Sequence, residues 1–176
     1  MEKSKKMVKL KKKEHPSWEE TFMRTAIEAA KRTRCEWVEV GAVIALMDEG
    51  NQQILTTGYN GPPRKVEHCD KVGVGCRRRD AEGNKIPGTY CIGAHAEINA
   101  ILNAARKGIC VENGTLFVTL SPCYECAKHI LNSGLKEVVY LRRYSDEFPD
   151  KKDEEEQAIA LIESVKKVCR PFTGKL

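Results

Sequence analysis

Two short stretches, Ala94-His95-Ala96-Glu97 and Ser121-Pro122-Cys123-Tyr124-Glu125-Cys126, determine how the rest of this chain is interpreted. They place one imidazole beside a carboxylate and, further along, two thiols close together. Imidazole nitrogen and thiolate sulfur are ligands that Zn²⁺ binds well, and a catalytic zinc site keeps three protein ligands and one open position. The predicted ligands of a catalytic zinc ion are His95, Cys123 and Cys126.

The spacing of the two cysteines suits a shared metal. Cys123 and Cys126 are three residues apart, so on a helix they lie on one face and reach one ion. Pro122 suits the first position of that helix, where a missing N–H costs nothing. A cysteine pair alone is also typical of a structural zinc knuckle or of two core thiols. The preceding His-x-Glu favours the catalytic interpretation.

The spacing of His95 and Glu97 makes a more specific prediction. Inside a helix of about 3.6 residues per turn, two positions two residues apart point roughly 200° away from each other. Both side chains reach one metal site only if His95 caps the helix and the regular turns begin after it. We therefore predict a helix over residues 97–107, ended by Gly108, with Glu97 left unligated as the acid–base group.

The length and the charge distribution of the chain indicate how its domains are organised. The 176 residues, 41% of them apolar, predict a single domain over residues 16–176. Residues 1–14 contain seven lysines and two glutamates, which accounts for the whole formal charge of +5. We expect residues 1–15 to form a basic, disordered tail. The remaining chain is neutral, which argues against a nucleic-acid partner.

The cysteine usage points to a reducing compartment. Eight cysteines occur in a chain with no signal-like apolar stretch, a pattern that favours metal binding over a disulfide framework. No run of 18 apolar residues occurs, so no membrane span is predicted. We expect a cytoplasmic protein.

The remaining chain alternates between helical and strand patterns. Ser17 caps a predicted helix over residues 18–34, and Glu20 completes a capping box. Residues 40–47 are apolar on both faces, which predicts a central strand, and residues 53–57 return as its hairpin partner. Further predictions are strands over 115–120 and 137–141 and helices over 122–131 and 154–168. This order indicates an α/β fold with a mixed sheet between helical layers.

Residues 64–93 form a long insert rich in glycine, charge and cysteine. A loop of this length inside a compact domain is usually functional or is tied down by something. A closed zinc site with four ligands would hold it in place, which motivates a second, structural zinc. The predicted ligands are Cys35, Cys69, Cys76 and Cys91, with His68 as the substitute if one of them does not converge.

Over about residues 16–144, the chain resembles a known family, the deoxycytidylate (dCMP) deaminases. His-x-Glu followed by Pro-Cys-x-x-Cys is the signature of the zinc-dependent base deaminases. The sequence Thr-Gly-Tyr-Asn-Gly at 57–61 and the cysteine-bearing insert narrow the resemblance to the dCMP group. The other segments that carry it are 16–18, 40–44, 68–70, 95–101 and 122–128.

The resemblance implies a cytidine deaminase-like, three-layer α/β/α fold with a mixed five-stranded sheet. It implies hydrolytic deamination of dCMP to dUMP and ammonia by a zinc-bound hydroxide, with Glu97 as proton shuttle, supplying dUMP for thymidylate synthesis. It also implies that Asn60 contacts the nucleotide and that the protein is a homo-oligomer, a hexamer regulated by dCTP and dTTP. Some members carry a second zinc, and Cys35 and Cys69 stand where two of its ligands are expected.

Several alternatives stay open. Asn60 is also typical of a turn beside Gly61, and Tyr124 lies either in the substrate pocket or on the surface. The rival functions are a tRNA adenosine deaminase or another base deaminase on the same fold, and a catalytically silent nucleotide-binding protein. The bifunctional riboflavin-pathway deaminase fits less well, because its second cysteine motif is usually longer.

Overall fold

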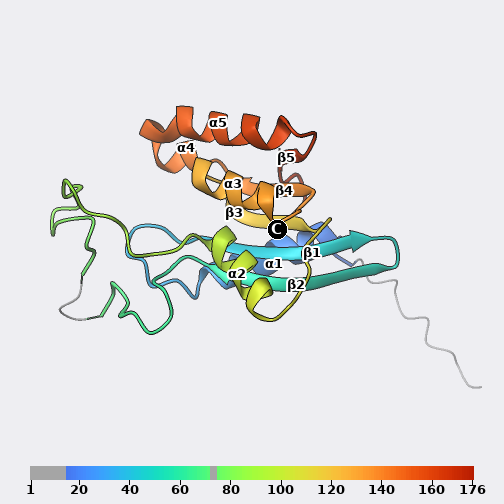
Figure 1. The fold of residues 1–176 in the computed structure, drawn as a ribbon, viewed down its shortest axis with the longest axis horizontal. Coiled ribbons are helices and arrows are strands. Elements are labelled where there is room, and N and C mark those ends of the chain that lie inside the picture. Colours follow the sequence, from blue (N-terminus) through green and yellow to red (C-terminus); the bar gives the residue numbers. More distant parts are fainter. Residues whose placement is uncertain (1–14, 72–74) are drawn as a thin grey trace, which may run out of the picture.

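The sheet is the framework of the molecule. In the computed structural model, which describes residues 15–71 and 75–176, five strands form one sheet in the order β2-β1-β3-β4-β5 (Figure 1). They are β1 (Gly41–Asp48), β2 (Asn51–Tyr59), β3 (Thr115–Leu120), β4 (Glu137–Arg142) and β5 (Val168–Pro171). β1 pairs antiparallel with β2 and β3, whereas β3, β4 and β5 run parallel. The predicted mixed five-stranded sheet is confirmed.

Helices cover both faces of this sheet. They are α1 (Trp18–Ala30), α2 (Ala96–Arg106), α3 (Tyr124–Asn132), α4 (Tyr144–Glu147), the 3₁₀ helix η1 (Pro149–Lys151) and α5 (Lys152–Glu163). Residues of α1 pack with one face of the sheet in a small core, and residues of α2, α3 and α5 pack with the other face in a larger core. The predicted three layers are therefore present.

The alternation of side chains along β1 explains why both faces are covered. Val43 and Ala45 are buried in the α1 core, and Ala42 and Ile44 are buried in the larger core. Successive strand residues point to opposite faces, so a continuous apolar run needs a helical layer on each side. β1 is accordingly a central strand, as its sequence predicts.

Two glycines bring helices unusually close to the sheet. A Cβ atom on Gly41 would lie 2.0 Å from the carbonyl oxygen of Ala26 in α1. A Cβ atom on Gly58 would lie 2.3 Å from the carbonyl oxygen of Ala96 in α2. Only glycine permits these approaches, and the second one fixes the N-terminal end of α2, where His95 and Glu97 lie.

Two predicted helices have different ends in the structure. The first helix stops at Ala30 instead of residue 34, because the chain turns there and the Thr33 hydroxyl donates a hydrogen bond to the Asn60 carbonyl oxygen at 2.6 Å. The last helix covers Lys152–Glu163 instead of 154–168. Lys166 then adopts a positive φ of 63°, and the chain returns to the sheet as β5, a strand that sequence analysis did not identify.

Two further predictions concern the N-terminal tail and the 64–93 insert. All of the predicted basic tail except His15 lies outside the described residues. The described part of the 64–93 insert contains no regular helix or strand beyond an isolated bridge between Arg79 and Lys85.

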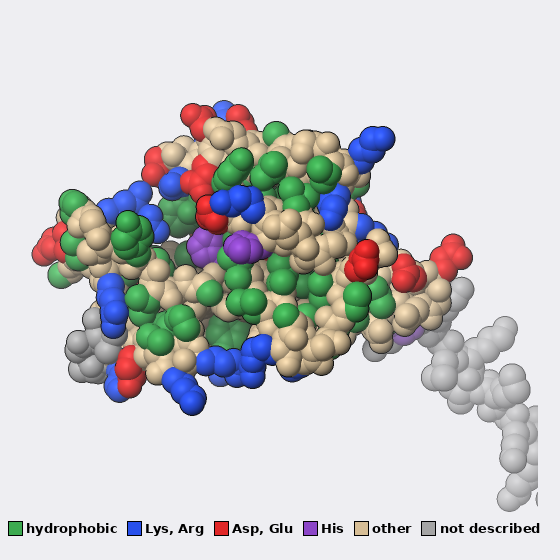
Figure 2. Space-filling view, viewed as in Figure 1, with side chains coloured by type: hydrophobic (Ala, Val, Ile, Leu, Met, Phe, Trp, Pro, Cys, Tyr) green, Lys and Arg blue, Asp and Glu red, His purple; other side chains and the backbone are tan. Residues whose placement is uncertain are grey.

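On the face shown in Figure 2, Lys and Arg side chains are interspersed with Asp and Glu. Among the described residues, no helix combines the length and apolar character needed to cross a membrane.

Candidate zinc and catalytic site

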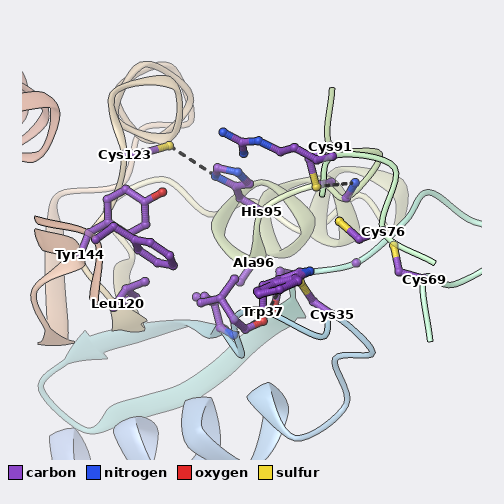
Figure 3. A pocket seen from close by; sticks show the side chains of 18 of the residues that line it. Cys35, Trp37, Cys69, Cys76, Cys91, His95, Ala96, Leu120, Cys123 and Tyr144 are labelled. Atoms are coloured by element: carbon purple, nitrogen blue, oxygen red, sulfur yellow. Dashed lines mark hydrogen bonds between the residues drawn. The ribbon is translucent and has the colours of Figure 1, made fainter. Parts of the chain in front are cut away.

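A cavity of about 160 Å³ opens where the N-terminal ends of α2 and α3 meet the insert (Figure 3). Its walls are largely apolar and aromatic, and His95, Glu97 and Cys123 form part of its lining. The apolar wall residues include Trp37, Val38, Val40, Leu120, Tyr144 and Phe148. Basic side chains at the same cavity are Arg34, Arg78, Arg79, Lys85 and Lys151. The arrangement suits a flat apolar ring that carries an anionic group.

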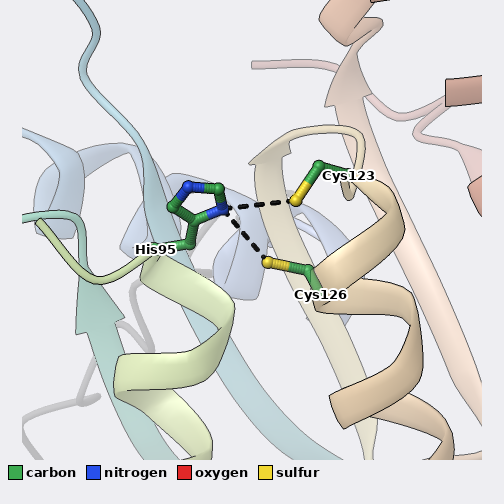
Figure 4. Close-up of side chains that lie close together, drawn as sticks. All are labelled: His95, Cys123 and Cys126. Atoms are coloured by element: carbon green, nitrogen blue, oxygen red, sulfur yellow. Dashed lines mark hydrogen bonds between the residues drawn. The ribbon is translucent and has the colours of Figure 1, made fainter. Parts of the chain in front are cut away.

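Three predicted ligands converge at this cavity (Figure 4). The Nδ1 atom of His95 lies 3.3 Å from the Sγ atom of Cys123 and 3.3 Å from the Sγ atom of Cys126. His95 is the N-cap of α2 with extended backbone angles, as its spacing from Glu97 predicts. Cys123 is the N-cap of α3, so the prediction that Pro122 occupies the first helical position is wrong by two residues.

The geometry of this group fits a zinc ion. Zinc–sulfur and zinc–nitrogen bonds of about 2.3 and 2.0–2.1 Å in a tetrahedron place the nitrogen and sulfur roughly 3.5 Å apart. The observed separations are close to that value. The three side chains therefore fit a tetrahedral zinc with one position left for a ligand from outside the protein, and they lie at two helix N-termini, where the dipole favours thiolates.

The pKa values reflect how closely these groups interact. A hydrogen bond from Cys126, with further help from His95, lowers the pKa of the Cys123 thiol to about 4. The hydrogen bond with Cys123 raises the pKa of His95 to about 9. Both shifts favour a thiolate on Cys123 beside a protonated His95 ring.

Glu97 completes the group. It is the second residue of α2, and only 4% of its surface is exposed. Burial raises the pKa of its carboxyl group to about 7. A carboxyl group with a pKa near neutrality accepts and donates a proton with similar ease.

Asn60 lies at the cavity, but its side chain is already engaged. Its Oδ1 atom accepts a hydrogen bond from the Val40 N–H at 2.9 Å, and its Nδ2 atom donates to the Val38 carbonyl oxygen at 3.0 Å. The amide therefore holds residues 38–40 as a wall of the cavity. The second N–H of the amide has no partner among the described residues.

The structure does not bring Tyr124 into this cavity. The residue is 37% exposed, and the Lys128 ammonium lies 5.7 Å from the centroid of its ring. Tyr144 is the tyrosine that lines the cavity, and Figure 3 places it beside Cys123 and Leu120.

The four cysteines of the predicted second site gather at one side of the same cavity. Cys35, Cys69, Cys76 and Cys91 all contribute to its lining, on the side away from Cys123 (Figure 3). Burial raises the pKa of Cys69, and the neighbouring charges of the other three cysteines raise it further. In the described part of the chain, only the His95 group brings three such ligand atoms within 4.8 Å of one another. The four thiols are therefore neighbours, spaced more widely than metal ligands.

His68, the substitute ligand, lies elsewhere. It lines a second cavity of about 240 Å³ together with Arg64, Lys65, Asn99 and Asn103. Its Nδ1 atom is buried and has no hydrogen-bond partner within the described residues.

Sequence reasoning missed Trp37 and Tyr144. Tyr144 follows the carboxyl end of β4, and Cys123 follows the carboxyl end of the adjacent parallel strand β3. Ligands bind at the carboxyl ends of parallel strands, so this signal was available. No local signal marks Trp37, because its place at the cavity depends on where the insert folds back.

Comparisons with known proteins point to one family. Residues 16–142 match the family model described as the cytidine and deoxycytidylate deaminase zinc-binding region. The deoxycytidylate deaminase of Mycobacterium phage D29 is 37% identical over 133 residues, covering 71% of this chain and 94% of the phage protein. The deoxycytidylate deaminase of Homo sapiens is 34% identical over 171 residues, covering 94% and 85% of the two chains.

Some relatives are much longer than this chain. The deoxycytidylate deaminase of Schizosaccharomyces pombe is 37% identical over 131 residues, which is 74% of this chain but 38% of that protein. The match to its Saccharomyces cerevisiae counterpart likewise spans 39% of that protein.

A solved structure shows the same fold. The dCMP deaminase from the cyanophage S-TIM5 in complex with dCMP and dUMP superposes with a TM-score of 0.67 at 25% identity, covering 91% of this chain and 100% of that one. The family model matches most of the chain, and His95, Cys123 and Cys126 form one group of ligand atoms. This chain therefore belongs to the cytidine and deoxycytidylate deaminase zinc-binding family.

Proposed function

We propose that this chain is a zinc-dependent dCMP deaminase, which hydrolyses dCMP to dUMP and ammonia. The observation that carries the proposal is the convergence of His95, Cys123 and Cys126 beside the buried carboxyl group of Glu97. The names of the relatives and the dCMP and dUMP bound to the similar phage enzyme support the choice of substrate.

The residues of the chain divide the chemistry between them. A zinc ion held by His95, Cys123 and Cys126 would supply the Lewis acidity that makes a water molecule acidic near neutral pH. Glu97 accepts a proton from the attacking water and delivers it to N3 of the cytosine ring, which makes C4 electrophilic. The water oxygen bonds to C4, and Glu97 then takes the remaining proton from the new C4 hydroxyl group and passes it to the amino group. The C4–N bond breaks, which releases ammonia and leaves the C4 carbonyl group of dUMP.

The basic rim of the cavity supports a nucleotide over a nucleoside. Most of its cations already have partners. Arg34 pairs with Asp70 at 3.7 Å, Lys85 with Asp150 at 3.3 Å and Lys151 with Glu154 at 2.7 Å. Arg79 lies 4.5 Å from the centroid of the Trp37 ring and donates to the Gly83 carbonyl oxygen.

Arg78 is the cation left for a ligand. It lines the cavity and has no ion pair or side-chain hydrogen bond within the described residues. A guanidinium group binds phosphate through two parallel hydrogen bonds. We therefore assign the 5′-phosphate of the substrate to Arg78.

Two further substrate contacts are proposed with different support. Asn60 lies at the cavity and has an amide N–H to offer a ligand. Tyr124 stays a prediction from sequence, and Tyr144 is the aromatic residue with better support, since it lines the cavity.

A second, structural zinc held by Cys35, Cys69, Cys76 and Cys91 also stays a proposal. Its support is that four thiols from two separate parts of the chain line one side of the same cavity. Ion binding would need them to move closer together. His68 does not lie with them and is the weaker alternative.

Regulation and assembly are proposals as well. Control by dCTP and dTTP and a hexameric assembly follow from the resemblance to the family. The second cavity is lined by Arg64, Lys65 and two asparagines, and these cations suit the phosphate groups of an effector. The molar mass measured by light scattering, with and without dCTP, tests both ideas. The cytoplasmic location also stays a prediction.

The deciding experiment measures ammonia release with dCMP, deoxycytidine, CMP and cytosine side by side, with zinc counted on the same sample. We expect fast turnover of dCMP alone. Turnover of none of them by a zinc-loaded protein would overturn the proposal and favour an RNA adenosine substrate or a silent nucleotide-binding protein. The neutral charge of residues 15–176 makes RNA the weaker candidate.

A further inference from the structure

A fully buried carboxylate lies directly behind the wall of the candidate site. Glu155, in the first turn of α5, has no exposed surface. It does not line the cavity, and neither the proposed reaction nor the predicted metal sites use it.

The contacts of Glu155 join the ends of two strands. Its Oε1 atom accepts a hydrogen bond from the Ser121 hydroxyl at 2.5 Å and another from the Tyr144 backbone N–H at 3.2 Å. Its Oε2 atom accepts from the Ser145 backbone N–H at 3.2 Å, and Arg143 Nε lies 3.4 Å from Oε1. One carboxylate thus receives donors from the carboxyl end of β3 and from the residues that follow β4.

The same contacts tie the two strand ends directly to each other. The Tyr144 N–H also donates to the Ser121 hydroxyl oxygen at 2.7 Å, and the Ser121 N–H donates to the Arg142 carbonyl oxygen at 2.9 Å. Ser121 and Tyr144 both line the cavity, and Ser121 is two residues before Cys123. On one side the network therefore reaches a residue two positions before a proposed metal ligand, and on the other side it reaches an aromatic residue of the cavity wall.

The energetics favour a role in geometry over a role in stability. Burying a carboxylate is unfavourable unless hydrogen bonds and a counter-charge compensate it, and well-packed apolar residues often serve stability equally well. What an apolar residue cannot do is hold several N–H and O–H groups in one fixed arrangement.

We propose that Glu155 is a positioning residue for the zinc and substrate site. Through Ser121 it holds residues 121–123 so that the Cys123 thiolate faces His95. Through the backbone at residue 144 it holds the Tyr144 ring against the cavity. Glu155 touches neither the metal nor the substrate. The activity part of this proposal rests on the proposed deaminase function, whereas the metal part does not.

The test uses the zinc-loaded protein and the variant Glu155→Gln. Glutamine keeps the volume of the side chain but replaces one acceptor oxygen with an NH₂ group that faces N–H donors. We expect zinc release to a chelator to become roughly 10- to 100-fold faster, the usual range when support around metal ligands is lost. With dCMP, KM rises and kcat/KM falls by a similar factor.

Ser121→Ala is the milder variant of the same link. It removes the hydroxyl group that donates to Glu155 and accepts from the Tyr144 N–H. We expect smaller increases in the rate of zinc release and in the KM for dCMP. The double variant should show the same values as Glu155→Gln alone, because the two residues act as one unit.

Arg170→Ala is the matched control. Arg170, in β5, pairs with Glu19 at 2.6 Å and with Glu137 at 2.7 Å, and none of these residues lines the cavity. We expect the variant Arg170→Ala to lower Tm but to leave the rate of zinc release and the KM for dCMP unchanged. If Glu155→Gln behaves like this control, or if its effects simply add to those of Ser121→Ala, the positioning role is refuted. A wild-type protein that ignores dCMP would refute the proposed function, and zinc release would still decide the role of Glu155.

Discussion

The Nδ1 atom of His95 lies 3.3 Å from the Sγ atom of Cys126, although 31 residues separate the two along the chain. Each residue belongs to the N-terminal end of a different helix, and both helices pack on the same face of the sheet. The candidate metal site therefore depends on how the two helices dock. Variants that disturb the docking should affect zinc binding, whereas variants of the proton shuttle should affect turnover.

Glu97→Gln should keep zinc and abolish turnover. The carboxamide fills the same space but cannot exchange a proton, and loss of general acid–base catalysis costs roughly 10²- to 10⁴-fold in rate. Zinc content and dCMP turnover are measured on the same sample. A variant that remains active, or that loses its metal, would show that Glu97 is not the unligated proton shuttle.

Gly58→Ala should weaken zinc binding from a distance. The added Cβ would meet the Ala96 carbonyl oxygen at 2.3 Å and the Ala100 nitrogen at 2.5 Å, so α2 has to shift. Overpacking of this kind costs about 1–3 kcal/mol of stability. Tm and the rate of zinc loss to a chelator both report the shift.

The control for that variant is Gly41→Ala, whose Cβ would meet the Ala26 carbonyl oxygen on the opposite face of the sheet. It should lower Tm and leave zinc loss at the rate of the unmodified protein. Equal effects of the two glycine variants on zinc loss would mean that the docking of α2 has no special importance for the metal site.

Arg78→Ala should raise KM for dCMP at least roughly 10-fold, because a charge-assisted contact to phosphate contributes about 1.5–3 kcal/mol. Any turnover of deoxycytidine, which lacks the phosphate, should not change. Arg77→Ala removes a neighbouring exposed arginine that does not line the cavity. This control should leave the KM for dCMP and any turnover of deoxycytidine unchanged. A KM for dCMP that is the same in all three proteins would rule out Arg78 as the phosphate ligand.

The second zinc makes a prediction about thiol reactivity. In protein loaded with two zinc ions per chain, Cys35, Cys69, Cys76 and Cys91 should resist alkylation, and removal of the metal should expose them together. Cys110 is exposed and belongs to no proposed site, so it should react equally in both states. Mass spectrometry of the alkylated peptides measures this, and rapid labelling of the four thiols in the zinc-loaded protein would argue against the site.

Glu155 also predicts a pH dependence of stability. Burial alone would raise its pKa, but the hydrogen bonds from Ser121 and Ser145 and the charge of Arg143 outweigh burial and leave the pKa below its usual value. A carboxyl group of this kind contributes stability above the pKa of the unfolded chain and loses the contribution as pH falls through the folded value. The Tm difference between the unmodified protein and Glu155→Gln should therefore be largest near neutral pH and shrink in acid. A constant difference down to the acid limit would contradict this.

Much of the candidate site was predictable from local sequence. The three-residue gap between Cys123 and Cys126 places both thiols at the start of one helix, and the two-residue gap between His95 and Glu97 requires His95 to be a helix cap. The structure has this geometry. The central strand β1 was equally predictable, because a continuous apolar run has to be covered on both faces.

Sequence alone thus determined which side chains are available as metal ligands and as the acid–base group, since local spacing and helix geometry decide that. Only the tertiary structure decided which residues surround them. β5, Tyr144 and Glu155 owe their roles to hydrogen bonds with partners on other segments, and Asn60 is engaged by residues about 20 positions earlier in the chain. The physical reason is that such contacts form where strand ends meet in the folded sheet, and no periodicity along the chain records that meeting.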